Sequence, residues 1–357
     1  MKILATLPDN MLNLSVHEMM EATRDFGLSK HEGTFKLDIN LNDFWEIDNL
    51  DYDIIHIHWP EALVDWKIPT ENDIKKLNNR LKQLKTQEKK IIITRHNAIP
   101  HTKTKLDAAL YKTAFSFADA IFHMEKFSYN EYKEFYGEFN WYTKQKHFFA
   151  PIIMYSKLPN TISKIEARAA LNINPNKFMY LVIGSIRNKK EKILIQNIAA
   201  LLEDKNDLLF VAQWPFYGNR IILKQIRQLL TKIKFPKHTF KFLPAIPDNK
   251  IQLYLNACDV LISPRMDSIN SGLISLGFSF SRTVIGPSAG NMGDILKETG
   301  NPMYNPSNLN NLKERLNKGK SLAISGHGNK NLEYAKNNWS WEKVGKLHYE
   351  AYVDILK

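Results

Sequence analysis

Cysteine is almost absent from this sequence of 357 residues: Cys258 is the only one, so no intrachain disulfide can form. Such sparse usage is typical of a cytosolic protein. The chain also lacks any run near the roughly 18 apolar residues that a membrane-spanning helix requires. Its first apolar run, residues 2–7, gives way at once to Pro8 and Asp9, which is too short for a secretion signal. We therefore expect a cytoplasmic protein that crosses no bilayer.

Acidic residues are also in short supply. The sequence holds 37 Asp and Glu against 49 Lys and Arg, which gives a formal net charge of +12. This excess favours anionic partners, either phosphorylated small molecules or an anionic surface on the inner face of the membrane. Nucleic acid is excluded as a partner, because no zinc pattern, RNA-binding aromatic run or basic recognition helix occurs. Aromatic residues alternate with Lys between 126 and 146, which fits packing between elements as well as a peripheral membrane contact.

The length is too great for one ordinary core and predicts two domains of similar size. Strand-like and helix-like patterns alternate in both halves, which indicates an α/β fold with parallel sheets. We place the first domain at 1–155 and the second at 175–335, with a polar linker over 154–177. The aromatic-rich helix at 339–357 is long enough to pack back on the first domain.

The stretch from 260 to 292 organises the second domain. A short apolar strand at 260–262 leads through a polar loop to Asn270, Ser271 and Gly272, and helical spacing follows over 271–280. A Ser or Asn before a helix caps it, and the backbone N–H groups behind the cap can hold a phosphate. A capped helix that binds nothing fits the same pattern.

A second loop, residues 184–190, follows the strand predicted at 178–183. It begins with Gly184, which permits close approach of the backbone, and it then carries Arg187 and Lys190. Alone, it would be a solvated charged loop. Beside the loop that ends at Gly272, it would surround a diphosphate with cations and N–H donors, and no metal would be needed.

Two strands of the first half, within 51–61 and 89–94, end in histidine-containing loops. Several histidines at strand ends indicate a pocket wall, while a lone histidine is usually structural. A zinc site that joins His56 and His58 to His96 or His101 is an alternative, disfavoured because no carboxylate lies at a ligand spacing. The substrate-binding candidates are His58, Trp59, Glu61, Asn97 and His101, with Asp267 from the second half.

Several segments together carry a resemblance to a known family. They are GSIRNKK at 184–190, SPRMDSINSGLISLGFSF at 263–280 and GPSAGNMGDIL at 286–296, with DIIHIHWPE, ITRHNAIPH and the closing WSWEKVGKLHYEAYVDIL. In this order they resemble the GT-B glycosyltransferases of the retaining family 4 type. The resemblance spans nearly the whole chain.

The resemblance implies two Rossmann-like domains that face one another across a cleft. The second would hold a UDP- or GDP-sugar, and the enzyme, of hexosyltransferase type, would pass the sugar to a glycan or lipid-linked acceptor in surface polysaccharide synthesis. It implies retention of configuration and neither cofactor nor metal. His96, Arg187 and Lys190 would be catalytic, with His96 on the donor sugar. The donor-binding set would be Gly184, Ser185, Arg187, Lys190, Asn270, Ser271, Gly272 and Leu273.

The sequence departs from the family at two glutamates, eight positions apart, of which the second grips the ribose. Their positions hold Ile269 and Gly277. Asp267 or Asn270 could replace the first, and nothing replaces the second. The missing glutamates favour one alternative, a catalytically inactive GT-B scaffold that binds a glycan or a partner enzyme. The other alternative is a GT-B sugar-nucleotide epimerase, which would need carboxylate or histidine groups to eliminate and re-add the nucleotide.

Overall fold

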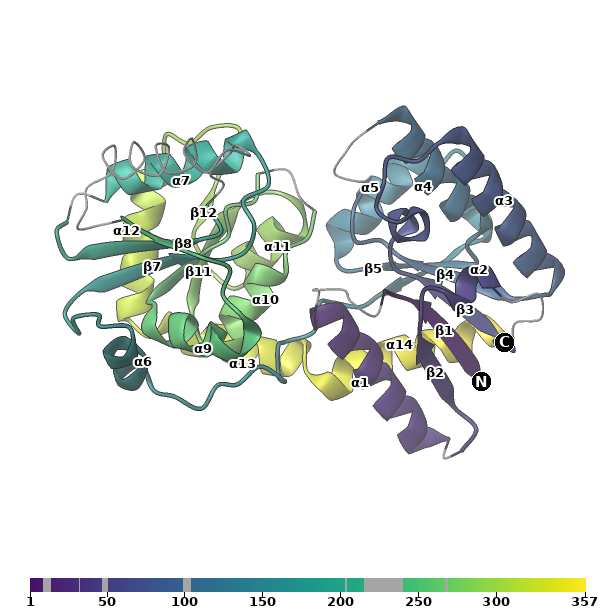
Figure 1. The fold of residues 1–357 in the computed structure, drawn as a ribbon, viewed down its shortest axis with the longest axis horizontal. Coiled ribbons are helices and arrows are strands. Elements are labelled where there is room, and N and C mark those ends of the chain that lie inside the picture. Colours follow the sequence, from purple (N-terminus) through teal and green to yellow (C-terminus); the bar gives the residue numbers. More distant parts are fainter. Residues whose placement is uncertain are drawn as a thin grey trace. The chain divides into compact units, whose positions relative to one another are not determined.

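The computed structural model describes residues 1–8, 14–31, 33–46, 51–98, 104–202, 204–214, 240–266 and 269–357. It divides into two compact units (Figure 1). Unit 1 is Met1–Ile153 with Asn338–Lys357, and unit 2 is Met154–Asn337. None of the described helices is long and apolar enough to span a membrane.

Unit 1 is built on a six-stranded parallel sheet in the order β2-β1-β3-β4-β5-β6. The four inner strands of this order are buried along nearly their whole length, as a parallel sheet covered by helices requires, and the two edge strands are partly exposed. They are β1 (Lys2–Thr6), β2 (Lys36–Ile39), β3 (Ile54–Ile57), β4 (Lys90–Thr94), β5 (Ala120–His123) and β6 (Lys146–Phe149).

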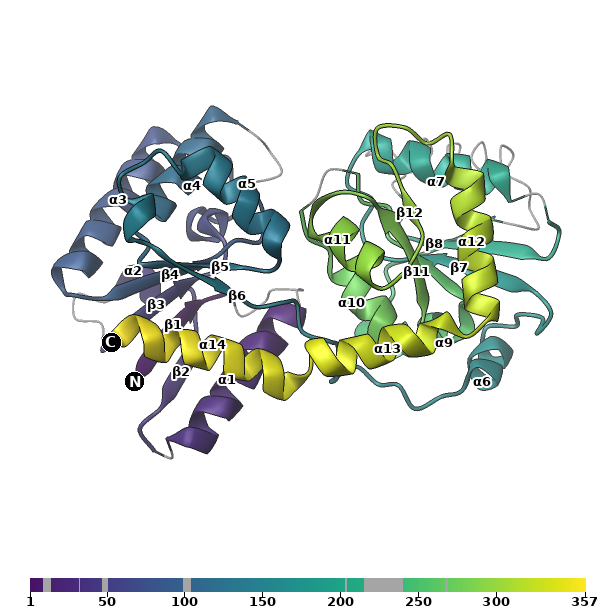
Figure 2. The same cartoon turned by 180° about the vertical axis from the view of Figure 1, so that it is seen from behind.

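Helices cover both faces of this sheet (Figure 2). One face packs against α1 (Leu14–Lys30) and α14 (Trp341–Leu356). The remaining helices of the unit are α2 (Asp43–Glu46), η1 (Pro60–Val64), α3 (Glu71–Thr86), α4 (Lys105–Phe117), α5 (Lys126–Tyr136) and η2 (Tyr142–Lys144). Thr70 and Thr104 begin α3 and α4 with capping boxes, which fix where these helices start.

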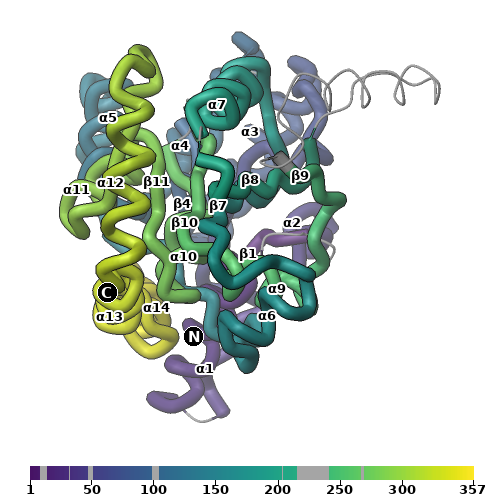
Figure 3. Tube along the Cα trace, turned by 90° about the vertical axis from the view of Figure 1, so that its left-hand side faces the viewer, coloured from purple at the N-terminus to yellow at the C-terminus, as the bar shows by residue number. Residues whose placement is uncertain are grey.

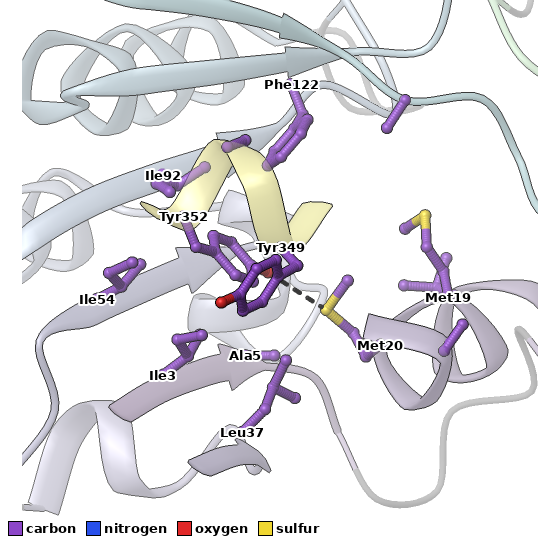
Figure 4. Close-up of a cluster of buried hydrophobic side chains, with 14 of the residues drawn as sticks. Ile3, Ala5, Met19, Met20, Leu37, Ile54, Ile92, Phe122, Tyr349 and Tyr352 are labelled. Atoms are coloured by element: carbon purple, nitrogen blue, oxygen red, sulfur yellow. Dashed lines mark hydrogen bonds between the residues drawn. The ribbon is translucent and has the colours of Figure 1, made fainter. Parts of the chain in front are cut away.

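The closing helix α14 completes the core of unit 1. Tyr352 is fully buried among α1 and the strands, and its hydroxyl donates to Met20 Sδ at 3.8 Å (Figure 4). The same hydroxyl oxygen lies 2.6 Å from His56 Nδ1. Gly345 lets α14 approach α1 closely, since a Cβ there would lie 2.3 Å from the Ala22 carbonyl oxygen. The last residues of the sequence are therefore part of the first folding unit.

Unit 2 holds a second six-stranded parallel sheet, in the order β12-β11-β10-β7-β8-β9. Its strands are β7 (Phe178–Val182), β8 (Asp207–Ala212), β9 (Phe240–Leu243), β10 (Val260–Ile262), β11 (Thr283–Pro287) and β12 (Met303–Tyr304). Its helices are α6 (Lys164–Ala170), α7 (Lys189–Leu201), α9 (Asp248–Ala257), α10 (Gly272–Ser279), α11 (Gly290–Glu298), α12 (Leu312–Ile324) and α13 (His327–Asn338). α7 and α12 share one face of the sheet, and α12 runs along β11 (Figure 3).

The segment predicted as a linker, 154–177, is organised differently from that expectation. It contains α6, which starts at a Ser163 capping box and packs against α9. Buried Arg168 pairs with Asp259 at 2.7 Å and donates from Nε to the Ala257 carbonyl oxygen. The segment therefore belongs to unit 2, and a buried ion pair helps to anchor it there.

Candidate functional site

The centre of the unit 2 sheet is a topological switch point. β7 and β10 are neighbours, and the later strands add outward on either side of them. Their registers match to the end, with Val182 opposite Ile262. Open α/β sheets bind ligands at the carboxyl ends of the strands, where the order reverses. The loops that follow β7 and β10 leave the sheet at that place.

These two loops touch. Gly184 has a φ of +87°, a left-handed conformation that favours glycine. A Cβ at this position would lie 3.6 Å from Arg265 Nη2 and 3.9 Å from Leu273 Cδ2. The structure thus brings the predicted donor loop, 184–190, against the start of α10.

A buried ion pair joins the same two loops. Arg265 Nη1 lies 3.0 Å from Glu191 Oε2 and also donates to the Ser185 carbonyl oxygen at 2.9 Å. Glu191 accepts the Arg187 N–H at 2.8 Å, and both side chains of the pair are almost fully buried. The Tyr304 hydroxyl holds the second loop by donating to the carbonyl oxygen of Arg265 at 2.6 Å. Sequence reasoning did not single out Arg265, Glu191 or Tyr304.

The polar face of the site carries the predicted side chains. Ser185, Arg187 and Lys190 are exposed, and the Ser185 hydroxyl donates to Gln213 Oε1, after β8, at 2.6 Å. Ser271 caps α10 by accepting the Leu273 N–H at 3.3 Å. Arg187, Lys190 and the N-termini of α7 and α10 therefore share one edge of the sheet. This arrangement suits a diphosphate.

The adjoining loop after β11 is tied to this edge. Asn291, which is buried in α11, donates from Nδ2 to Asn270 Oδ1 at 2.5 Å, and its N–H donates to the Ile269 carbonyl oxygen. Ile269 is itself buried. Asn270, one of the two predicted substitutes for the missing first glutamate, is thus held by an amide partner.

Position 277, where the family carries its ribose-binding glutamate, has a structural reason to be glycine here. Gly277 is a buried residue of α10, and a Cβ would lie 2.5 Å from Val284 Cγ2 and 3.0 Å from Leu261 Cδ2. Helix α10 therefore packs on β10 and β11 too closely for a side chain. No carboxylate can stand at this position without moving the helix.

Unit 1 gathers its candidate residues at the ends of β3 and β4. His58 Nδ1 lies 3.1 Å from His96 Nε2, and the Trp59 ring stacks on His96 at 4.0 Å. Burial lowers the pKa of His96 to about 3 and that of His58 well below its usual value. Both imidazoles are therefore neutral at pH 7 and can exchange hydrogen bonds without carrying charge.

Glu61 lies in η1, two residues after Trp59. Its Oε2 accepts the Tyr111 hydroxyl at 2.5 Å, and Asn97 is a second hydrogen-bond partner. Burial raises the pKa of this carboxyl. Trp59 and Glu61 are both largely buried, whereas Trp66, which packs against Trp59 at 5.8 Å, is 49% exposed. Trp66 was not predicted, although it follows the same loop.

Two predicted residues, His101 and Asp267, lie outside the described residues. Among the described residues, no group of three or more His, Cys, Asp or Glu side chains could hold a metal ion. His56, considered as a zinc ligand, instead uses both ring nitrogens, on Tyr352 and on Thr94 Oγ1. Asp53 precedes β3, at the end of the strand away from His58, and its carboxylate accepts the Lys2 N–H.

Solved structures share this architecture. Sucrose-phosphate synthase from Thermosynechococcus elongatus superposes with a TM-score of 0.71 at 14% identity, covering 99% of this chain and 98% of that one. The chain has the GT-B fold. HepE from Anabaena, in complex with UDP, gives 0.71 at 13% identity over 99% of each chain. A glycosyltransferase from Rickettsia africae gives 0.64 at 15% identity, over 100% of this chain and 98% of that one.

The likeness is one of fold. No protein-family model and no curated protein matches the sequence. The predicted α/β class with two Rossmann-like units is confirmed.

Proposed function

We propose that this protein is a glycosyltransferase that moves a sugar from a nucleoside diphosphate to an acceptor hydroxyl. The observation that carries the proposal is the contact of the Gly184 loop with the start of α10 at the switch point of unit 2. Among proteins of the same fold, HepE has been solved with UDP-glucose, and trehalose-6-phosphate synthase with UDP-2-fluoro glucose. A UDP-sugar is accordingly the first donor to test, with a GDP-sugar second.

In this proposal the chemistry is carried by charge stabilisation. Arg187 and Lys190, with the N–H groups at Ser271 and Gly272, hold the diphosphate as the bond to the sugar breaks. The leaving phosphate then takes the acceptor proton, and configuration is retained without a metal or a protein base. His96, neutral at pH 7, supplies a hydrogen bond to the donor sugar instead of a second positive charge.

Calorimetry with UDP and GDP tests donor binding. Wild type should bind one of them, and Arg187→Ala and Lys190→Ala should each weaken binding by about tenfold or more, since a hydrogen bond to a charged group contributes about 1.5–3 kcal/mol. Lys250→Ala, an exposed lysine at the start of α9, is the matched control and should bind like wild type. Absence of binding by both nucleotides, or an unchanged Arg187→Ala, would contradict the proposal.

The acceptor in this proposal is a glycan or a lipid-linked sugar of a surface polysaccharide, met at an anionic membrane surface. Its support is the net charge of +12. Sedimentation with anionic vesicles should remove the protein from solution at low salt and release it at high salt. Equal recovery in the supernatant at both salts would rule out the membrane contact and leave a soluble acceptor.

A second candidate is an inactive scaffold of the same fold. It is favoured by Ile269 and Gly277, which stand where the family carries glutamates and which are packed in the core. Donor hydrolysis above background, monitored as release of UDP from UDP-glucose, would exclude it.

A further inference from the structure

Unit 2 contains a cavity that the proposed donor site does not use. Its volume is about 290 Å³, near the lower end of the roughly 300–1,000 Å³ typical of small-molecule sites. It lies at the end of the edge strand β12, between the turn that follows this strand and the first turns of α12. Its lining includes the polar side chains of Ser288, Asn305, Asn308, Asn311, Arg315 and Lys318.

The inner wall of the cavity is rigid. Buried Asn301 accepts the Val284 N–H at 3.0 Å and donates to Asn331 Oδ1 at 2.8 Å. Buried Tyr304 is fixed by its bond to the Arg265 carbonyl oxygen. Because these groups already have partners, the cavity is formed before any ligand arrives.

Its open side presents hydrogen-bond donors. Asn305 Oδ1 accepts the Ser307 N–H at 2.9 Å, and Asn308 Oδ1 accepts the Asn310 N–H at 3.0 Å. With the amide oxygens used in this way, the two NH₂ groups remain for a ligand. The side chain of Asn311 makes no capping bond, so the first N–H groups of α12 also lack that acceptor.

The charge of the lining is positive. Arg315 and Lys318 are one turn apart on α12, and no Asp or Glu is among the described residues that line the cavity. Glu314 lies 3.3 Å from Arg315, but its side chain is 65% exposed, and such a surface pair contributes little. Donor groups and two cations without a carboxylate fit an oxyanion.

We propose that this cavity is a second binding site of unit 2, which takes a phosphate group. The phosphate is either free or carried on a small molecule such as a sugar phosphate. The inference does not depend on the proposed transferase activity, since it uses none of the residues assigned to the donor.

Calorimetry with saturating UDP present tests this site, because UDP then fills the donor loops. The probes are inorganic phosphate, glucose 6-phosphate and glucose. Phosphate and glucose 6-phosphate should bind the wild-type protein, and glucose should not. Tighter binding of inorganic phosphate would indicate a site for free phosphate, and tighter binding of glucose 6-phosphate would indicate a site for a sugar phosphate. If UDP fails to bind, the same probes are titrated into the Arg187→Ala variant instead. Failure of the donor proposal is then distinguished from failure of this one.

Variants locate the binding. Arg315→Ala and Lys318→Ala should each weaken it at least tenfold, and Asn308→Asp, which adds a carboxylate without adding volume, should abolish it. Lys336→Ala, an exposed lysine of α13 that does not line the cavity, should leave it unchanged. UDP affinity should be the same in all four variants. Absence of probe binding, or equal binding by wild type and Asn308→Asp, would overturn the proposal.

Discussion

The buried pair between Arg265 and Glu191 makes a strong prediction, because it connects the loop after β10 to the first turn of α7. Arg265→Met removes the cation and keeps an unbranched apolar side chain of comparable length. Glu191, which is 0% exposed in its side chain, is then left as a buried carboxylate without its ion-pair partner. The Ser185 carbonyl oxygen also loses its donor.

The expected cost follows from that geometry. Breaking a buried ion pair by removing one partner destabilises a protein by about 3–5 kcal/mol, whereas an exposed pair contributes about 0–1 kcal/mol. Adding Glu191→Gln removes the uncompensated charge and keeps an oxygen that can accept the Arg187 N–H. The double variant should therefore be more stable than Arg265→Met alone, with a coupling energy of about 0.5–3 kcal/mol.

Hydrogen exchange followed by mass spectrometry is a suitable assay, because it reports unit 2 separately from unit 1. Peptides that span residues 184–195 should exchange far faster in Arg265→Met, and protection should partly return in the double variant. UDP affinity should fall in both, since the loop at Ser185 loses its anchor. The prediction is refuted if Arg265→Met lowers the free energy of unfolding by less than about 1 kcal/mol. It is also refuted if the double variant is less stable than Arg265→Met alone.

Three further predictions concern packing and pH. Gly277→Ala should cost about 1–3 kcal/mol in urea unfolding, because its Cβ would lie 2.5 Å from Val284 Cγ2; an unchanged midpoint would show that α10 can move. Gly345→Ala should lower the melting temperature of unit 1, as its Cβ would lie 2.3 Å from the Ala22 carbonyl oxygen, and a wild-type value would contradict the close crossing of α1 and α14. Acid should unfold unit 1 first. Burial lowers the pKa of His96 to about 3 and that of His348 to about 4, whereas both have a pKa of about 6.5 in the unfolded chain. Below pH 6.5 the unfolded chain therefore binds protons that these two histidines do not bind in the folded unit. Stability should then fall by about 1.4 kcal/mol per pH unit for each histidine as the pH drops towards 4, and it should be constant above pH 7.5. Tryptophan fluorescence can follow this, because six of the seven tryptophans lie in unit 1; a flat response between pH 7 and 5 would contradict it.

Much of the fold could be predicted because the central strands are continuous apolar runs. The segments at 178–183 and 260–262 have the composition of strands buried on both faces, and glycine and capping residues mark the loops that follow. Their adjacency could not be predicted from periodicity, since strand order depends on pairing between distant segments. The resemblance implied only that the two loops hold the same donor.

The buried polar contacts could not be predicted either, because their partners are also far apart in the sequence. Arg265 and Glu191 are separated by 74 positions, and each resembles an ordinary surface charge when seen alone. Arg168 and Asp259, 91 positions apart, kept α6 from being recognised, because its anchor is an ion pair instead of an apolar stripe. Trp59, predicted as a substrate-binding residue, lies with its ring against His96 and is largely buried.

The two units differ in the charge that their candidate residues present. Unit 2 offers Arg187, Lys190 and helix N-termini, which suit the two negative charges of a departing diphosphate. Unit 1 offers His58 and His96, both neutral at pH 7 because burial lowers their pKa, and Glu61, whose pKa burial raises. The two neutral imidazoles suit the hydroxyls of a sugar, for which a fixed charge gives little discrimination between positions. In the proposed transfer, charge develops on the nucleotide alone, so substitution of His58 or His96 should change the choice of sugar and leave UDP affinity unchanged.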